Sequence, residues 1–316
     1  MLTQIFFDEY RGALTEGARY DNRNDTLAWV DIIAAEIHRV CLKNPEASHE
    51  VIKVSEPSES IGAIALTSNP DVLVACAKYG VGYANFQTGK FEYFLKYPHE
   101  TSRLRSNDGI VDPWGHLWIG VMTDFHLGDV VAEGKLYRIN CHSLQVETMI
   151  DHCYIPNGMA FSSDGRKLFW TDSIAGTIVE YDYDVLRNQL SNKREVLNVK
   201  KSSKYKDFAP DGMCMTKTNN IFGAMFNGSR VVHVDSVGNV VEDIAIPAQC
   251  VTNAHIGGAN NDQLFVNTAH IDHEEKDFVP NAKDKKGDLG GYLFKVQLER
   301  SYEPQPNYIW GGTVKG

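Results

Sequence analysis

Short apolar runs recur along the chain at a nearly constant spacing. Six of them have consecutive apolar residues instead of alternating ones, which is the pattern of strands buried on both faces. Their first residues are separated by 46, 44, 51, 53 and 43 positions, which indicates a structural unit repeated six times. The runs occupy residues 27–32, 73–78, 117–122, 168–173, 221–226 and 264–269.

Each run has the same surroundings. A stretch rich in Gly, Pro, Asn and Asp precedes it, a further short run lies before that turn, and two more strand candidates follow. Four short strands repeated six times predict an all-β fold, a six-bladed β-propeller with four antiparallel strands per blade. The alternative of two α/β domains would need helical periods of 10–15 residues between strands, and we find none.

The two ends of the chain are expected to meet in one blade. Residues 307–312 have the pattern of that blade's fourth strand, and residues 4–7 can add to the sheet that holds residues 290–312. This pairing would close the ring, so residues 1–316 are predicted to form a single domain. Residues 31–42 alone could form an amphipathic helix, but the repeat places a loop and a third strand there, and we expect the strand.

Composition and charge narrow the class of protein. The chain has 31 Lys and Arg against 41 Asp and Glu, a net charge of −10, which argues against nucleic acid or an anionic membrane as partner. No segment approaches the ~18 apolar residues of a membrane span, and the first residues lack the basic start of a secretory signal. The six cysteines form no CxxC and are expected to be buried thiols in a reducing compartment. We therefore expect a cytoplasmic protein, and nothing in the sequence indicates its oligomeric state.

One face of the predicted propeller carries the long loops. Strand direction alternates in each blade, so the starts of the first strands, the loops between second and third strands and the links between blades lie on the same face. Four of these segments are long, and function is expected where loops are elaborated on a rigid scaffold. They are residues 98–107, 122–134, 199–210 and 270–290. His270 and His273 in the last segment are expected to be solvated and are not assigned to a site.

Polar residues recur at the start of the first strands. When these strands are aligned on a small residue, the residue before it has a side-chain oxygen in five of six cases. Such residues are common turn formers, but recurrence at one register favours side chains that converge on the propeller axis. Carboxylates converging there would repel each other unless a cation were bound. The aligned residues are Glu16, Ile61, Asp108, Asn157, Asp211 and Asn253.

A divalent ion fits this arrangement. Glu16 and Asp211 supply two negative charges, and Asn157 adds a neutral oxygen. All-oxygen ligands suit Ca²⁺, Mg²⁺ or Mn²⁺, and the residue types also admit Zn²⁺. The sequence contains no G-x-S-x-G, H-E-x-x-H or Walker motif that would indicate another chemistry.

Several motifs together resemble the senescence marker protein/gluconolactonase/luciferin-regenerating family, which includes regucalcin. The clearest are EGARYD (16–21), RSNDGIVDPWG (105–115), IPNGMAF (155–161) and APDGMCM (209–215). The resemblance implies a divalent metal in the propeller channel and hydrolysis of lactones, typically sugar lactones. It also implies residue roles: Glu16, Asn157 and Asp211 as metal ligands, Asp211 as catalytic acid/base, and Arg105 and Asn107 as substrate-binding residues.

Two positions depart from the family pattern. Phe125 stands where the family has a carboxylate that contacts sugar hydroxyls, with Asp124 just before it, and Ala18 stands where many members have Pro. The sugar identity therefore does not follow from the resemblance. Two alternatives stay open: a metal-dependent esterase or phosphotriesterase of a less polar substrate, and a non-catalytic propeller that binds calcium or other proteins.

Overall fold

The computed structural model describes residues 1–54, 59–99, 102–275, 278 and 287–314. It divides the chain into two compact units. The first consists of Met1–Ala18 with Asn157–Gln305, and the second of Arg19–Pro156 with Pro306–Gly316. The predicted long segments 98–107 and 270–290 fall partly outside the described residues.

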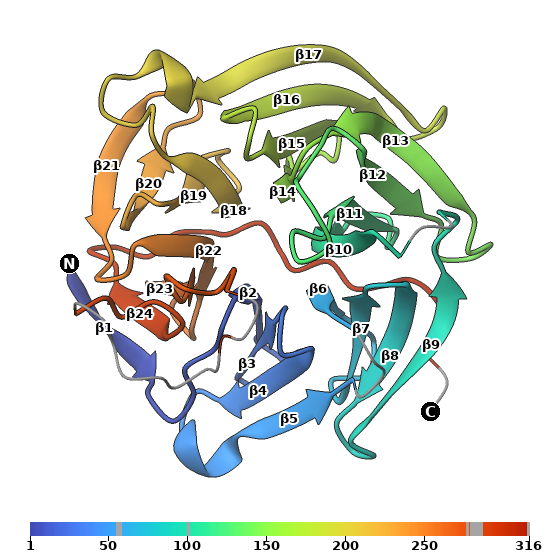
Figure 1. Cartoon of the computed structure of the whole chain (residues 1–316), viewed down its shortest axis with the longest axis horizontal. Helices are drawn as coiled ribbons and strands as arrows, with labels where there is room; N and C mark the ends of the chain where they lie inside the picture. Colours follow the sequence, from blue (N-terminus) through green and yellow to red (C-terminus); the bar gives the residue numbers. More distant parts are fainter. Residues whose placement is uncertain (55–58, 100–101, 276–277, 279–286, 315–316) are drawn as a thin grey trace. The chain divides into compact units, whose positions relative to one another are not determined.

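The first unit contains three antiparallel sheets of four strands among the described residues. In each sheet of consecutive strands the first strand in sequence is innermost, and successive strands lie side by side (Figure 1). The strands are β14 (Pro156–Phe161), β15 (Lys167–Asp172), β16 (Thr177–Asp184) and β17 (Gln189–Asn198); β18 (Ala209–Met215), β19 (Ile221–Phe226), β20 (Arg230–Val234) and β21 (Val240–Ala245); and β22 (Cys250–Gly257), β23 (Gln263–Ala269), β24 (Leu293–Gln297) and β1 (Leu2–Phe7). A short 3₁₀ helix, η2 (Val199–Lys201), follows β17.

The second unit repeats this plan with three more sheets in its described part. Its first strand, β2 (Thr15–Asp21), begins in the other unit. The strands are β2, β3 (Thr26–Asp31), β4 (Glu36–Cys41) and β5 (Glu50–Lys53); β6 (Ile61–Leu66), β7 (Val72–Ala77), β8 (Gly80–Asn85) and β9 (Lys90–Lys96); and β10 (Leu104–Val111), β11 (Leu117–Thr123), β12 (Gly134–Ile139) and β13 (Val146–Cys153). A 3₁₀ helix, η1 (Glu46–Ser48), precedes β5. Six sheets of four antiparallel strands confirm the predicted fold class, a six-bladed β-propeller.

The apolar core lies between sheets, as the two-sided runs predict. Every residue of β7 and β11 is buried, whereas β9 and β17 alternate or are largely exposed. Second strands are covered on both faces by neighbouring sheets, so they need apolar residues at consecutive positions. Outermost strands have one face toward solvent and tolerate the polar residues seen there.

The segment with helical periodicity, residues 31–42, forms a strand. Oδ1 of Asp31 accepts the backbone N–H groups of Ile33 and Ala34, at 3.2 and 3.1 Å, and Ala35 has φ 55°. This side-chain-capped turn reverses the chain into β4, which pairs with β3. The repeat register was therefore the better guide to this segment than its local pattern.

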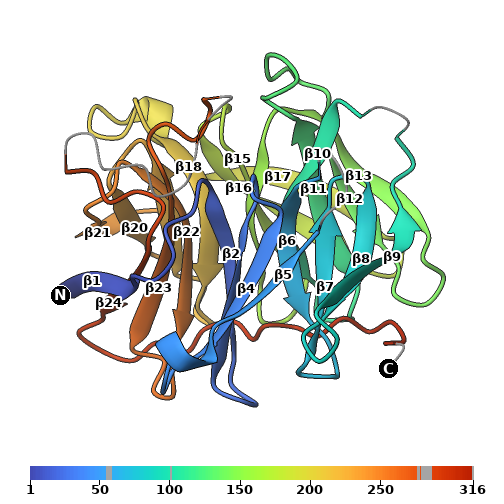
Figure 2. The same cartoon turned by 60° about the horizontal axis from the view of Figure 1, so that its bottom comes forward.

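The prediction for residues 307–312 is wrong, because they form no strand. The outermost position in that sheet belongs to β1, which pairs antiparallel with β24 and lies beside it in Figure 2. Residues 306–314 instead belong to the second unit, where Trp310 N–H donates to Leu66 O and Gly311 N–H to Gly115 O. Trp310 is buried in the core of that unit. The apolar residues of 307–312 therefore pack into a core and do not join a sheet.

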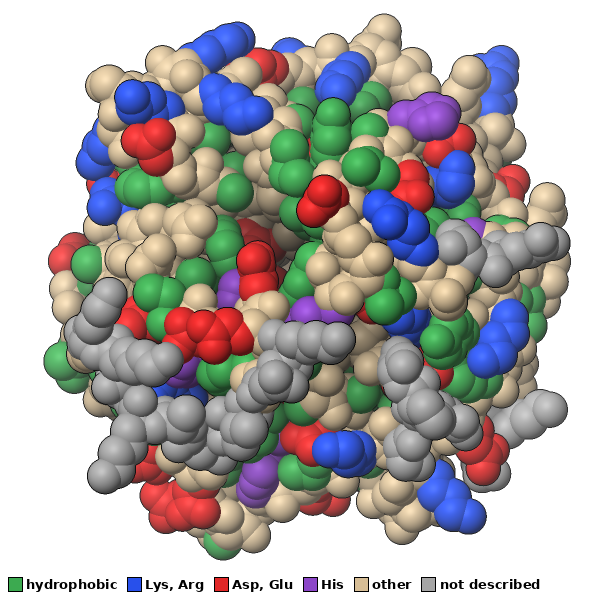
Figure 3. Space-filling model, viewed as in Figure 1, with side chains coloured by type: hydrophobic (Ala, Val, Ile, Leu, Met, Phe, Trp, Pro, Cys, Tyr) green, Lys and Arg blue, Asp and Glu red, His purple; other side chains and the backbone are tan. Residues whose placement is uncertain are grey.

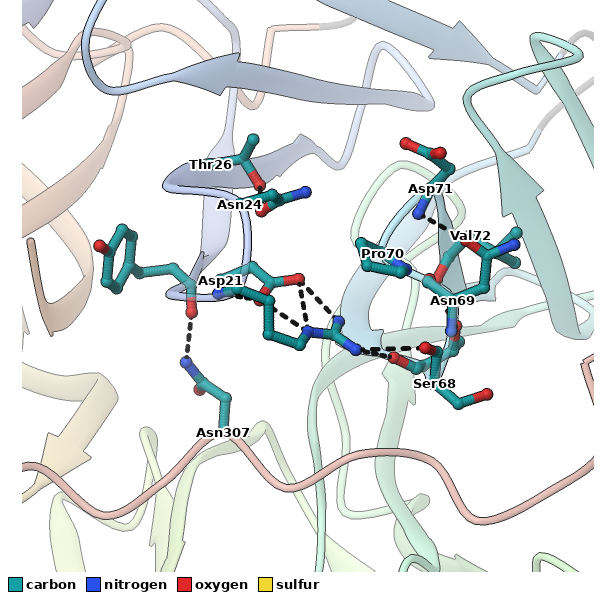
Figure 4. A network of polar contacts seen from close by, with 12 residues as sticks. Asp21, Asn24, Thr26, Ser68, Asn69, Pro70, Asp71, Val72 and Asn307 are labelled. Atoms are coloured by element: carbon teal, nitrogen blue, oxygen red, sulfur yellow. Dashed lines mark hydrogen bonds and ion pairs between the residues drawn. The ribbon is translucent and has the colours of Figure 1, made fainter.

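Polar contacts join two sheets of the second unit at their turns. The Arg23 guanidinium binds the Asp21 carboxylate and donates to Thr67 O, so the β2–β3 turn is tied to the β6–β7 turn (Figure 4). Asn307 Nδ2 donates to Tyr20 O at 2.9 Å and adds the C-terminal segment.

All six cysteines are free thiols, four of them buried and two half-buried. No helix among the described residues is long and apolar enough to cross a membrane.

Candidate functional site

Bulges interrupt the innermost strands at the aligned polar residues. In β18 the register skips Asp211 and Gly212, because Pro210 pairs with Met225 and Met213 with Gly223. In β10 it skips Asn107 and Asp108, between Ser106 and Gly109. A bulge adds a residue that has no partner on the next strand and redirects its side chain. The P-D-G sequence of β18 and the N-D-G sequence of β10, which resemble turns, are thus bulges inside strands.

Asn157 places a buried amide oxygen in the first unit. The residue is 4% exposed, and its Nδ2 donates to the Ser173 hydroxyl at 3.0 Å. Nδ2 is thus the end of the amide that faces Ser173, and Oδ1 is the opposite end. Oδ1 is fully buried and accepts no hydrogen bond from any residue that the structure describes. A buried acceptor in this state costs free energy unless something else binds it.

Asp211 lies next to Asn157 because glycine lets their strands approach. A Cβ on Gly158 would lie 2.5 Å from Asp211 O, so only glycine fits between β14 and β18. A Cβ on Gly212 would lie 2.6 Å from Asn253 Nδ2, which places β22 equally close to β18. The glycine in each P-[ND]-G sequence therefore serves the close packing of neighbouring innermost strands.

Glu16 is fixed at the start of β2 against β22 and β23. The Thr252 hydroxyl donates to Thr15 O at 2.7 Å, and the Thr15 hydroxyl donates to Thr268 O at 2.8 Å. Glu16 is 6% exposed, and its Oε2 accepts the N–H of Gly17, which has φ 61°. The three predicted ligands thus belong to innermost strands of the first unit, with β22 between β18 and the start of β2.

Asn253 is a further oxygen donor that the residue assignments omitted. It lies at the aligned position of β22, is 1% exposed, and has a buried Oδ1 with no hydrogen-bond donor in the described part of the chain. The signal was present in the alignment, but its T-N-A sequence lacks the P-[ND]-G form of the other positions.

The donor set of this unit suits a hard divalent ion. Two buried carboxylates and two buried amide oxygens offer only oxygen, and burying anionic groups together is unfavourable without a cation. Among the described residues no group of three or more His, Cys, Asp or Glu is placed to hold a metal ion. The predicted set has only two such side chains, Glu16 and Asp211, and it depends on Asn157 for a third ligand.

Arg105 and Asn107 lie together in the second unit. Arg105 is 3% exposed, and its guanidinium donates to Asn107 Oδ1 at 2.9 Å and to Ser106 O at 2.8 Å. Asn107 Nδ2 donates to Pro156 O at 3.1 Å. The two predicted substrate-binding residues therefore form one hydrogen-bonded group.

Asp108, at the aligned position of β10, has a different partner. Its carboxylate lies 3.8 Å from the Arg19 guanidinium, which also donates to Gly109 O. Burial raises the pKa of Asp108, and the charge of Arg19 opposes that change. Asp108 is thus a polar residue of the aligned series whose charge is balanced by an arginine and not by a metal ion.

Sequence reasoning missed Lys78 beside this group. Lys78 is 1% exposed, and its Nζ lies 2.7 Å from Oδ2 of Asp124, which is 7% exposed. The Phe125 ring lies beside Arg105, whose guanidinium carbon is 5.3 Å from the ring centroid. The available signal was a lysine that ends the otherwise apolar run 73–78.

The expectation for His270 and His273 is wrong, because both are buried. They are 3% and 6% exposed. His270 N–H donates to Ala13 O, which folds the start of the loop onto the N-terminal segment, and His273 Nδ1 donates to His270 O. The His273 ring packs edge-on against Phe226. Local backbone pairing, which the charged sequence of the loop conceals, removes the rings from solvent.

Comparisons with known proteins find similar chains over most of this sequence. The family model described as "SMP-30/Gluconolactonase/LRE-like region" matches residues 14–270. The "Cell growth-regulated gene 1 protein" of Candida albicans is 44% identical over 98% of this chain and 97% of its own length. "Putative sugar lactone lactonase YvrE" of Bacillus subtilis is 29% identical over 94% of this chain and 95% of its own. Among solved structures, the calcium-binding protein regucalcin of Agrobacterium tumefaciens has a TM-score of 0.82 and 20% identity, over 98% of this chain and 97% of that one.

Proposed function

Because the chain belongs to the SMP-30/gluconolactonase/LRE-like family, we propose that it is a divalent-metal-dependent hydrolase that opens lactone rings. The lactonase name of one relative supports the reaction class. The observation that carries the proposal is the Asn157 amide, whose nitrogen donates to Ser173 and whose buried oxygen is bound by no donor of the described chain. Glu16 and Asp211, whose side chains are also buried, belong to the same unit.

Glu16, Asn157 and Asp211 would hold the ion. Their charges and oxygen donors suit Ca²⁺, Mg²⁺ or Mn²⁺, and Zn²⁺ is compatible with the same set. Asn253 is a candidate for a further ligand, because its buried oxygen is in the same state as that of Asn157. A bound divalent ion would polarise the lactone carbonyl and stabilise the negative charge that forms on its oxygen.

The reaction adds one water across the ring ester bond. Water attacks the carbonyl carbon, the bond from that carbon to the ring oxygen breaks, and a hydroxy acid is released. Asp211 would take the proton from the attacking water and return it to the departing ring oxygen. A carboxylate suits both steps, since it is a base when ionised and an acid once protonated.

Arg105 and Asn107 would bind the substrate. The guanidinium is always charged and presents several N–H donors in a plane, so it can hold lactone oxygens in a fixed orientation. Asn107, which accepts from Arg105 and donates to Pro156 O, would keep the guanidinium in place. Orientation of this kind lowers the entropic part of the barrier.

Metal removal tests the proposed function directly. Dialysis of the purified protein against a chelator should reduce hydrolysis of a lactone panel at least about 100-fold, because carbonyl polarisation is worth several kcal/mol. Adding back Ca²⁺, Mg²⁺, Mn²⁺ or Zn²⁺ singly, with pH-stat detection of the acid released, should restore it. Full activity in the metal-free protein would refute the metal dependence, and no turnover of any lactone with any ion would refute the proposal.

Ser173→Ala tests whether the Asn157 amide is held for an ion. Loss of the hydroxyl lets the amide rotate, and such changes in groups that orient a ligand weaken metal binding about 10- to 100-fold. Calorimetric titration with Ca²⁺ or Mn²⁺ should show this loss while the melting temperature changes little. Ser163→Ala, at an exposed serine in the β14–β15 turn of the same sheet, is the matched control and should bind as the wild type does. Equal affinities in all three proteins would contradict the role given to Asn157.

A further inference from the structure

A buried ion pair engages Asp124, the carboxylate that precedes Phe125 in the chain. Lys78 follows β7 and Asp124 follows β11, and Lys78 Nζ contacts Asp124 Oδ2 at 2.7 Å. The other oxygen, Oδ1, accepts the backbone N–H of His126 at 3.2 Å. Burial would raise the pKa of Asp124, but the charges of Lys78 and then Arg105 lower it overall. The carboxylate is therefore ionised, and both of its oxygens already bind donors of the protein.

The next residue, Phe125, presents an aromatic ring beside Arg105. The Phe125 ring is half-buried and lies beside the Arg105 guanidinium, 5.3 Å from its central carbon to the ring centroid. The His126 ring also packs against it, at 4.5 Å between centroids. A phenyl ring accepts no ordinary hydrogen bond from a hydroxyl group, so this position favours contact with apolar atoms.

The loop between β11 and β12 also exposes apolar side chains, next to the exposed His126 and Asp129. Leu127 is 51% exposed and Val131 43% exposed. In the same view as Figure 1, Figure 3 shows hydrophobic side chains gathered where this loop lies. Monomeric proteins seldom keep such side chains together in water without a binding role.

The loop is held in place by hydrogen bonds and one ion pair. Arg103 Nε binds Glu133 Oε1 at 2.6 Å, and its NH2 group donates to Asp129 O at 2.8 Å. The Thr123 hydroxyl donates to Glu133 Oε1 at 2.6 Å. These contacts at both ends fix a surface on which apolar side chains stay exposed.

We infer that the lactone opened by this protein carries an apolar alkyl or aryl substituent, with Phe125 as the residue that determines specificity. This inference rests on the proposed function. Arg105 would hold the ester oxygens, while Phe125 would contact the substituent. A polyhydroxylated lactone would place hydroxyl groups against the phenyl ring and against a carboxylate that Lys78 already occupies, and unpaired polar groups lower the specificity constant.

The test compares two substrates in four proteins. The substrates are D-glucono-1,5-lactone and a δ-valerolactone bearing a pentyl or phenyl group, and the measured quantity is the ratio of their kcat/KM values, apolar over sugar. We expect a ratio of at least about 10 for the wild type, falling about tenfold in Phe125→Ala, because contact with a few apolar carbons is worth that much. Phe125→Leu, the matched apolar control, should keep the ratio within about threefold. Phe125→Glu should bring it below 1.

The outcomes separate the two proposals. Preference of the wild type for the sugar lactone, with the same ratio in Phe125→Ala, would overturn this inference and leave lactone hydrolysis standing. A failure to open either lactone with any of the four ions would overturn the proposed function and this inference with it. If the ratio falls in Phe125→Ala because KM for the apolar lactone rises, while the circular dichroism spectrum matches that of the wild type, the result would support a direct contact at Phe125.

Discussion

Replacement of Asp211 by Asn should lower metal-dependent lactone hydrolysis by at least about 10³-fold. The substitution keeps the size of the side chain, so the bulge in β18 and the contact of Asp211 O with Gly158 can persist. It removes one of the two negative charges that would hold the ion, and it removes the group that would take the proton from water. Loss of a general base alone costs about 10²- to 10⁴-fold.

Two measurements separate the lost ligand from the lost base. Titration with Mn²⁺ should show weaker binding, and kcat at saturating metal should remain low, because added metal restores occupancy but not proton transfer. Asp207→Asn, an exposed aspartate four residues earlier, is the matched control and should keep wild-type turnover. If Asp211→Asn hydrolysed lactones at the wild-type rate, the catalytic assignment would be wrong. Full recovery of kcat in excess metal would leave Asp211 as a ligand only.

The strands could be predicted well because strands buried on both faces have consecutive apolar residues. Runs such as 117–122 are apolar at every position, as a strand covered on both faces requires. The same criterion failed at residues 307–312, where Tyr308 and Trp310 pack into a core without joining a sheet. Apolar composition shows that a segment is buried, but only the pairing of β1 with β24 decides which segment completes the sheet.

The candidate site could be predicted in part because its residues repeat at one register. Asn157 and Asp211 stand in the same P-[ND]-G-M frame, and the fold places them on neighbouring innermost strands. The bulge at Asp211 was hidden, because the residues that make a bulge are the same ones that make a turn. The Asn157 amide is hydrogen-bonded to Ser173, a partner that no local pattern indicates.

The partner of Lys78 could not be read from the sequence. Lys78 and Asp124 are 46 residues apart, on the ends of strands in different sheets. A lysine that ends an apolar run is usually interpreted as the point where a strand reaches solvent. Here the ammonium stays buried because a carboxylate from the next sheet meets it, and such long-range pairing depends on the packed structure.

Lys78→Met should lower the free energy of unfolding by about 3–5 kcal/mol, because it leaves the Asp124 carboxylate buried without its closest cation. Methionine keeps the length and the apolar stem of lysine, so packing changes little. The double variant Lys78→Met/Asp124→Asn should recover most of the loss, since the amide oxygen that replaces the carboxylate can still accept the His126 N–H and no unpaired charge remains. Denaturant unfolding at pH 8 measures all three proteins.

An exposed pair of the same unit provides the control, and pH provides a second test. Lys135→Met removes a cation from the partly exposed Asp151 and should cost less than about 1 kcal/mol. In Lys78→Met the pKa of Asp124 should rise above its unfolded value of about 4, so lowering the pH from 8 to 5 should protonate it preferentially in the folded state. The stability gap to the wild type, in which Lys78 and Arg105 keep that pKa low, should therefore narrow toward pH 5. If the free energies of unfolding of the wild type and Lys78→Met differed by less than about 1 kcal/mol at pH 8, or differed more at pH 5 than at pH 8, the Lys78–Asp124 pair would not stabilise the fold in this way.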